Sequence, residues 1–215
     1  MNGFAPAPTA GAQRAVEHAE RMLSTEGIWF DSWGNDLRDN NLDGVVDDRG
    51  EQGFADGVHY GRSYWADVCY VPYLEVNQCP GLLRRRVQVQ YKVCIDVPLE
   101  SYRAAGLPVP HIRRIPGLAA WFRRQREWQT WRAPNLPDPL LPGDFVAVMN
   151  REHQHSGIVQ DVAFGLLSNV INLPGPSVMR RFYLYDPNAF NDIISIPTWV
   201  WRSFLGFDFV ARPRV

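Results

Sequence analysis

The sequence lacks the features that mark several large classes of protein. It contains no run of about 18 apolar residues, so no membrane-spanning segment is predicted. Its formal net charge is only −1 at pH 7, which gives no electrostatic reason to expect binding to nucleic acid. It has neither an internal repeat nor a low-complexity linker. What remains is a chain of 215 residues, 46% of them hydrophobic, that can bury one sizeable core.

The chain also begins without the pattern of a secretory signal. Residues 1–8 show no positively charged region followed by an apolar core. Two expectations are compatible with this start. The protein is either cytoplasmic, or it is exported by a dedicated secretion system and acts in the periplasm of a target cell.

Cysteine is scarce, and the three cysteines have different settings. Cys69 and Cys79 are close enough in sequence to form a disulfide around a short loop, but two buried free thiols explain the same residues. Cys69 is also a rival nucleophile, although the extended chain around Pro72 that follows it offers no helix dipole. Cys94 differs from both because a helical pattern follows it.

The segment around Cys94 predicts a strand, a thiol and a helix in direct succession. Residues 87–93 alternate between apolar and polar side chains, which is the period of a half-buried strand. Residues 94–106 then follow a helical pattern with acidic residues in the first turns and Gly106 at the end. A thiol at the N-terminus of a helix has its thiolate favoured by the helix dipole, so we expect Cys94 to be a nucleophile.

Candidate partners for this thiol lie in two later strands. A turn signal at 141–144 precedes the apolar run 145–149, and a hairpin between this run and the next places His155 near its bend, where it can act as a base. A third apolar run contains Asn172. This asparagine can hydrogen-bond the imidazole and fix its tautomer, or it can simply cap the turn that follows.

These segments resemble the NlpC-type branch of the papain-like cysteine peptidases, which cleave bonds in the peptide stems of bacterial cell walls. The matching pieces are a cysteine that opens a helix closing in Tyr-Arg-Ala-Ala-Gly, a Pro-Gly-Asp turn before a strand, and His-Ser-Gly-Ile-Val, within residues 87–215. The resemblance implies that Cys94 is the nucleophile, His155 the base and Asn172 the residue that orients the base. It also implies that a polar side chain upstream of the cysteine, Gln90 or Tyr91, helps to hold the oxyanion.

A second motif is an acidic loop in the N-terminal third of the chain. Oxygen-bearing side chains alternate along 39–43 and a glycine follows, which is a pattern that wraps a calcium ion. Gly50 stands where the EF-hand loop has its bidentate acid, so Glu51 or Asp48 has to substitute for it. The alternative is a solvated acidic turn. The predicted ligands of a structural calcium ion are Asp39, Asn41, Asp43, the backbone carbonyl of Val45, and Asp47.

The whole pattern predicts an α+β fold in which a strongly bent antiparallel sheet packs against the Cys94 helix. We expect a single catalytic domain over 1–215: an extension over 1–86 with an amphipathic helix and the calcium loop, and a papain-like core over 87–215. Within the core we expect a helix near 116–127, a short helix over 197–204 and a last strand over 207–211. Three tryptophans beside an arginine cluster are candidates for stacking on a sugar or peptide: Trp121, Trp128 and Trp131.

The resemblance implies a cysteine hydrolase that cuts amide bonds in peptidoglycan stem peptides or crossbridges. Without a secretory signal, the prediction is an antibacterial effector whose further partners are a secretion apparatus component and an immunity protein. Calcium fits this prediction, because it is scarce in the cytosol and would stabilise the fold only after delivery. Two alternatives remain open: a cytoplasmic cysteine hydrolase or deamidase that acts on proteins, and a non-catalytic, calcium-stabilised binding module.

Overall fold

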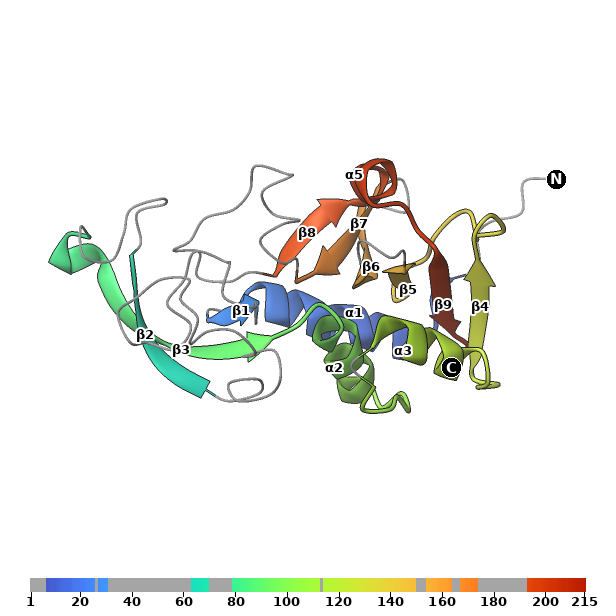
Figure 1. The fold of residues 1–215 in the computed structure, drawn as a ribbon, viewed down its shortest axis with the longest axis horizontal. Helices are drawn as coiled ribbons and strands as arrows, with labels where there is room; N and C mark the ends of the chain where they lie inside the picture. The colour runs from blue at the N-terminus through green and yellow to red at the C-terminus, as the bar shows by residue number, and fades with distance from the viewer. Residues whose placement is uncertain are drawn as a thin grey trace. The chain divides into compact units, whose positions relative to one another are not determined.

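The structure, a computed structural model, contains two compact units. Its helices and strands are drawn in Figure 1. The first unit comprises Met1–Leu23, Cys94–Asn172 and Ser195–Val215, and the second comprises Ser24–Val93 and Leu173–Ile194. The N-terminal helix therefore belongs with the Cys94 segment, whereas the sequence placed it in an extension that ends at residue 86. The structure describes residues 7–25, 27–30, 63–69, 79–112, 114–149, 154–163, 167–173 and 193–215.

A six-stranded antiparallel sheet forms the centre of the first unit. Its strand order is β4-β9-β5-β6-β7-β8. The predicted hairpin is present, since β5 and β6 pair with Val148 opposite His155. The expected mixture of helices and antiparallel strands is thus confirmed, while the papain-like form of the fold stays a prediction. The strands are β4 (Trp128–Arg132), β5 (Phe145–Met149), β6 (Gln154–Ala163), β7 (Leu167–Asn172), β8 (Ile194–Pro197) and β9 (Phe209–Pro213).

Helices cover both faces of this sheet (Figure 1). On one face, Phe122 at the end of α3 packs against Phe145 of β5 and Phe209 of β9. On the other face, Trp201 of α5 stacks on His155 of β6. In the described part of the chain, no helix is both long and apolar enough to cross a membrane. The helices of this unit are α1 (Ala10–Leu23), α2 (Asp96–Ala104), α3 (Ile115–Phe122) and α5 (Thr198–Phe204).

Helix α2 ends as its sequence predicts, at a glycine in the left-handed conformation. Gly106 has a φ of +78°. Its N–H donates to the Arg103 carbonyl at 3.0 Å, and the N–H of Leu107 donates to the Tyr102 carbonyl at 2.9 Å. This pair of bonds is a Schellman motif, which satisfies carbonyls that the last turn would otherwise leave unpaired. The Arg14 side chain of α1 donates to the Ala105 carbonyl at the same end, through Nε at 3.3 Å and Nη2 at 3.1 Å.

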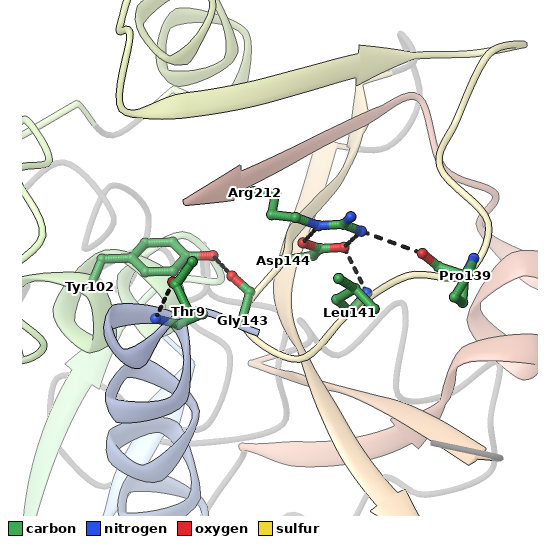
Figure 2. A network of polar contacts seen from close by, with 8 residues as sticks. Thr9, Tyr102, Pro139, Leu141, Gly143, Asp144 and Arg212 are labelled. Carbon is green, nitrogen blue, oxygen red and sulfur yellow. Dashed lines mark hydrogen bonds and ion pairs between the residues drawn. The ribbon is translucent and has the colours of Figure 1, made fainter. Parts of the chain in front are cut away.

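A tight turn before β5 joins both α1 and α2 to the sheet (Figure 2). The Tyr102 hydroxyl of α2 donates to the Gly143 carbonyl at 3.0 Å. Gly143 has a φ of +85°, and a Cβ built on it would lie 2.6 Å from the Cβ of Ala12 in α1. Only glycine fits this position, because a side chain would be strained in the left-handed region and would also collide with the helix. The Pro-Gly-Asp signal therefore marks a turn and also a contact point for a helix.

The same turn carries a buried ion pair with the last strand (Figure 2). The fully buried Asp144 accepts two hydrogen bonds of 2.7 Å from the Arg212 guanidinium and one of 2.8 Å from the Leu141 N–H. Burial raises the pKa of Asp144, although these hydrogen bonds and the Arg212 charge act in the opposite direction. A buried carboxylate that keeps all of its partners is tolerated, and one that loses them is strongly destabilising.

Aromatic side chains fill the space between α2, α3 and the sheet, and they correct one sequence interpretation. Trp128 was a candidate for ligand stacking, but it is buried in β4 and packs at 4.9 Å on the Tyr102 ring and at 4.4 Å on the Phe122 ring. Trp131, three residues later, has its ring centre 4.9 Å from the Arg212 guanidinium. Trp128 is therefore a core residue. The sequence pattern did not predict β4, because its five residues lie in a stretch rich in proline and arginine.

The second unit contains a three-stranded sheet with the order β1-β3-β2. Strand β3 confirms the strand predicted just before Cys94. It pairs in parallel with β1 over Gln90–Lys92 and antiparallel with β2 over Arg84–Gln90. A single turn of 3₁₀ helix, Gly81–Leu83, precedes it. The strands are β1 (Ile28–Phe30), β2 (Ser63–Cys69) and β3 (Arg84–Lys92).

Gly143 and Gly106 allow a matched test of the turn. Both have positive φ, so an alanine at either position costs about 1–2 kcal/mol of left-handed strain. Only Gly143 has a helix against it, which adds about 1–3 kcal/mol of overpacking. We predict that Gly143→Ala lowers the free energy of unfolding by about 1–3 kcal/mol more than Gly106→Ala does, as measured by urea denaturation. Equal losses would show that α1 moves away from the turn at no cost.

Candidate functional site

The chain delivers Cys94 to the start of a helix, as the sequence predicts. Strand β3 ends at Lys92 and helix α2 begins at Asp96. Cys94 lies in the short turn between them, directly before the N-cap residue Ile95. It is a free, half-buried thiol, whereas Cys79 is disulfide-bonded. Cys94 is thus the free thiol that the described residues offer for nucleophilic chemistry.

The electrostatic environment of the thiol differs from the expected one. Burial raises the pKa of Cys94 to about 11, and the Asp96 carboxylate acts in the same direction. The polar backbone and side-chain groups of Ser156 near the thiol lower the pKa, but by less than burial raises it. Desolvation therefore outweighs the helix N-terminus that was expected to favour the thiolate. The thiol of this half-buried residue is therefore neutral at pH 7.

His155 and Asn172 form a buried hydrogen-bonded pair across β6 and β7. The distance from His155 Nε2 to Asn172 Oδ1 is 2.9 Å, and Asn172 Nδ2 donates to the Val170 carbonyl at 3.1 Å. Because the amide nitrogen is directed to Val170, the amide oxygen faces the imidazole. This network assigns the ring proton to Nε2 and leaves the lone pair on Nδ1. Asn172 thus fixes the tautomer that a general base needs.

Burial also controls the charge of the imidazole. It lowers the pKa of His155 to about 4, and the hydrogen bond to Asn172 opposes this shift only partly. His155 is therefore neutral at pH 7, like the thiol. A neutral imidazole can accept a proton, whereas an imidazolium cannot. The resting site thus holds a neutral thiol and a neutral base rather than a thiolate–imidazolium pair.

Trp201 of α5 covers one face of the imidazole, and the sequence did not single it out. The two ring centroids are 5.0 Å apart with an interplanar angle of 16°. The indole Nε1 donates to the Gly206 carbonyl at 3.1 Å, and the Phe207 ring stacks on Trp201 at 6.0 Å. This stack keeps water from one side of the His155–Asn172 hydrogen bond. Its only sequence signal is a tryptophan within the predicted short helix at 197–204.

Gly157, the glycine of His-Ser-Gly, allows β7 to approach closely enough for this pair to form. It lies opposite Asn172 in the register. A Cβ at Gly157 would stand 2.4 Å from Val170 Cγ1 and 2.8 Å from the Ile171 carbonyl oxygen. Contacts this short would push β7 away from β6 and separate the asparagine from the imidazole. The glycine is therefore part of the geometry of the site.

The Cys94 thiol interacts with Ser156, the residue next to His155 in β6, rather than with the His155 imidazole. Successive side chains of a strand point to opposite faces, and His155 points to the face of α5, where Trp201 lies. Ser156 therefore points to the other face, and it is Ser156 that interacts with the thiol. The buried Ser156 hydroxyl has no hydrogen-bond partner of standard geometry. Although both residues are fully described, no hydrogen bond joins Cys94 to His155.

The remaining predicted site residues lie elsewhere. Gln90 and Tyr91 are on β3 in the second unit, where Gln90 lines a pocket; the Tyr91 side chain is not among those described. Within the ranges that the structure describes, no group of three or more His, Cys, Asp or Glu residues could hold a metal ion. The predicted calcium ligands fall outside those ranges: Asp39, Asn41, Asp43, Val45 and Asp47.

The direction of the thiol shift can be tested by alkylation. We predict that the rate at which iodoacetamide modifies Cys94 in the folded protein keeps rising up to about pH 10, because the thiolate fraction is still growing there. In urea the rate for the same thiol should reach half of its maximum near the ordinary pKa of 9.0, well below the midpoint in the folded protein. Mass spectrometry of the adduct confirms the site of modification. A rate that is already level below about pH 7 would show a stabilised thiolate and contradict the prediction.

Comparisons of the chain with family models, with curated proteins and with solved structures find no match. What the site can do chemically therefore follows from its own residues and geometry.

Proposed function

We propose that the protein is a cysteine hydrolase that cleaves amide bonds in peptidoglycan stem peptides or crossbridges. The observation that carries this proposal is the buried hydrogen bond between His155 and Asn172, on a strand whose next residue, Ser156, interacts with the Cys94 thiol. A buried imidazole with a fixed tautomer and a nearby thiol are the parts needed for base-assisted nucleophilic attack. The substrate class comes from the resemblance of the motifs to the NlpC-type peptidases.

In the proposed reaction the two neutral groups act together. Sγ of Cys94 attacks the carbonyl carbon of the amide while Nδ1 of His155 takes the thiol proton. The imidazolium then gives this proton to the leaving nitrogen, the C–N bond breaks, and a thioester remains. Water, deprotonated by Nδ1, attacks the thioester and releases the acid and the thiol. The backbone N–H of Cys94, at the positive end of α2, stabilises the oxyanion.

This reaction requires the thiol and Nδ1 to come within hydrogen-bond distance. Catalytic hydrogen bonds are often long or misaligned before substrate binds and tighten only in the complex. The thiol meets Ser156 on one face of β6 and the imidazole points to the other, so the Cys94 segment has to move relative to this strand before the attack. Asn172 and Trp201 keep the imidazole in position, so the nucleophile is the group that moves.

A second candidate function is a non-catalytic binding module that keeps these residues for structural reasons. The specific observation in its favour is that Cys94 and His155 share no hydrogen bond and are both neutral. A cytoplasmic hydrolase or deamidase acting on proteins would use the same chemistry as the main proposal and differ only in its substrate. Export by a secretion apparatus and recognition by an immunity protein stay predictions.

Substitutions at the proposed triad separate these functions. We predict that Cys94→Ala and His155→Ala each abolish the hydrolysis of purified muropeptides, because one removes the nucleophile and the other the base. Asn172→Ala should retain more activity, since it removes only the group that orients the base. Mass spectrometry of the products checks this and identifies the bond cleaved. Full activity of Cys94→Ala would refute the proposed chemistry, and an inactive wild-type protein would favour the binding module.

Calcium binding by the acidic loop has its own test. If Asp39, Asn41 and Asp43 are ligands, millimolar calcium should raise the melting temperature by mass action and a chelator should reverse the effect. The double substitution Asp39→Ala with Asp43→Ala should remove the response, because too few hard ligands would remain for a cation that takes about six to eight oxygens. Magnesium at the same concentration is the control. A melting temperature that does not change with calcium would show that this loop is a solvated acidic turn and not a calcium site.

A further inference from the structure

One residue of the His-Ser-Gly motif takes no part in the proposed chemistry. Ser156 lies between His155 and Gly157, and it is fully buried. Its hydroxyl has no hydrogen-bond partner of standard geometry. By contrast, the equally buried Ser101 of α2 donates its hydroxyl to the Val97 carbonyl at 2.7 Å. A buried hydroxyl without such a partner costs free energy on folding, so the presence of Ser156 calls for an explanation.

The side chain of Ser156 points to the face of β6 that α1 and α2 cover. Alternate residues of a strand share a face, and Gln160, on the same face as Ser156, donates to Glu20 of α1 at 2.7 Å. Helix α2 packs against β6 as well. His155 points the other way, toward Trp201 of α5. The Ser156 hydroxyl is therefore directed toward the helices and away from the imidazole.

The backbone of Ser156 faces away from β5. The Val159 N–H donates to the Asp144 carbonyl at 2.9 Å, so Val159 directs its backbone groups toward β5 and the turn before it. These directions alternate along a strand, so the backbone groups of Ser156 point to the side of β7. Strand β7 ends at Asn172, which is opposite Gly157, so the Ser156 N–H lies just past the last pair of these two strands. A group placed beside the end of β7 can thus meet both the N–H and the hydroxyl of Ser156.

The Cys94 thiol is the group that meets Ser156. The backbone and side-chain groups of Ser156 both lower the pKa of the thiol, whereas burial and the Asp96 carboxylate raise it. Cys94 is also the first residue of its segment in the first unit, since Val93 before it belongs to the second unit. Ser156 therefore contacts the nucleophile at the point where the chain enters the first unit.

We propose that Ser156 is a positioning residue for Cys94: its N–H and hydroxyl hold the sulfur at the helix face of β6, in a resting position that the thiol leaves to reach His155. A neutral thiol is a weak acceptor and a thiolate is a strong one, so the hydroxyl is fully used only when the sulfur is ionised. The contact keeps the nucleophile apart from its base in the resting protein. The release of the thiol before attack rests on the proposed function, whereas the contact itself does not.

The ionisation of Cys94 tests the contact without any substrate. The protein is labelled with cysteine that carries ¹³C at Cβ, and the NMR signal that Cys94→Ala removes is that of Cys94, whose shift follows the charge on the sulfur. Ser156→Ala should lower the ionised fraction at about pH 10 by about 10-fold, the scale of a lost hydrogen bond to a charged group. Ser101→Ala removes a buried hydroxyl that is already bonded to a carbonyl, so it is the matched control and should change the fraction less than about 2-fold.

Stability and a variant that keeps the hydroxyl provide further controls. Ser156→Ala should melt no lower than the wild type, because it removes a buried hydroxyl that lacks a full partner. Ser156→Thr should keep the ionised fraction within about 2-fold of the wild type, because threonine offers the same donor. An ionised fraction that Ser156→Ala leaves unchanged or raises would overturn the proposal. So would an equal loss in Ser156→Thr or in Ser101→Ala, which would assign the effect to packing.

Activity measurements separate this proposal from the proposed function. Because the thiol leaves Ser156 before attack, Ser156→Ala should raise kcat/KM for muropeptides at pH 7 by about 2- to 5-fold, the scale of one neutral hydrogen bond. A kcat/KM that is unchanged or lower would overturn the resting position. If the wild-type protein hydrolyses muropeptides but the ionised fraction of Cys94 does not respond to Ser156→Ala, the contact is wrong and the function stands. If no hydrolysis occurs but the ionised fraction responds as expected, the contact stands and the hydrolase proposal fails.

Discussion

The first unit depends on the turn at 142–144, where two helices and two strands meet. Gly143 accepts a hydrogen bond from α2 and lies against α1, and its own N–H donates to the Val159 carbonyl of β6 at 2.9 Å. Asp144 then holds Arg212 of β9. These contacts are possible because Gly143 has no side chain to push the helix away and because the Asp144 carboxylate is buried. Because the turn also begins β5, it sets where the β5–β6 hairpin starts and thus where His155 stands in the sheet.

The burial that stabilises this unit also determines the chemistry of the site. The sheet and helices exclude water from His155 and Asn172, and burial also raises the pKa of the half-buried Cys94, so neither the thiolate nor the imidazolium is favoured. A site of this kind holds its proton on sulfur until a substrate arrives. The free energy needed to create the two charges is then part of the barrier to attack on the carbonyl, where the oxyanion and the imidazolium can stabilise each other.

Much of the framework was predictable because it depends on local patterns. The apolar run 145–149 after a Pro-Gly-Asp turn predicts β5, and the acidic first turn with a terminal glycine predicts α2. The placement of Asn172 near His155 followed from the resemblance of the motifs. The role of Trp201 could not be read from the sequence, because its contact with His155 joins residues distant in the chain. The pKa of Cys94 was equally inaccessible, since helix position is local whereas desolvation depends on the whole fold.

The attachment of α1 to the far end of α2 has a consequence for motion. Arg14 and the Schellman motif at Gly106 hold α2 at its C-terminal end, and Tyr102 fixes its middle to the turn at Gly143. A helix held at two points does not slide or tilt readily, so movement near Cys94 is confined to the short link between β3 and α2. Side-chain rotation there takes picoseconds to nanoseconds, whereas shifting a packed helix takes microseconds or longer. Because the imidazole points to the opposite face of β6 from Ser156, side-chain rotation alone does not bring the thiol to it, and a slower movement of the link between β3 and α2 has to precede the attack.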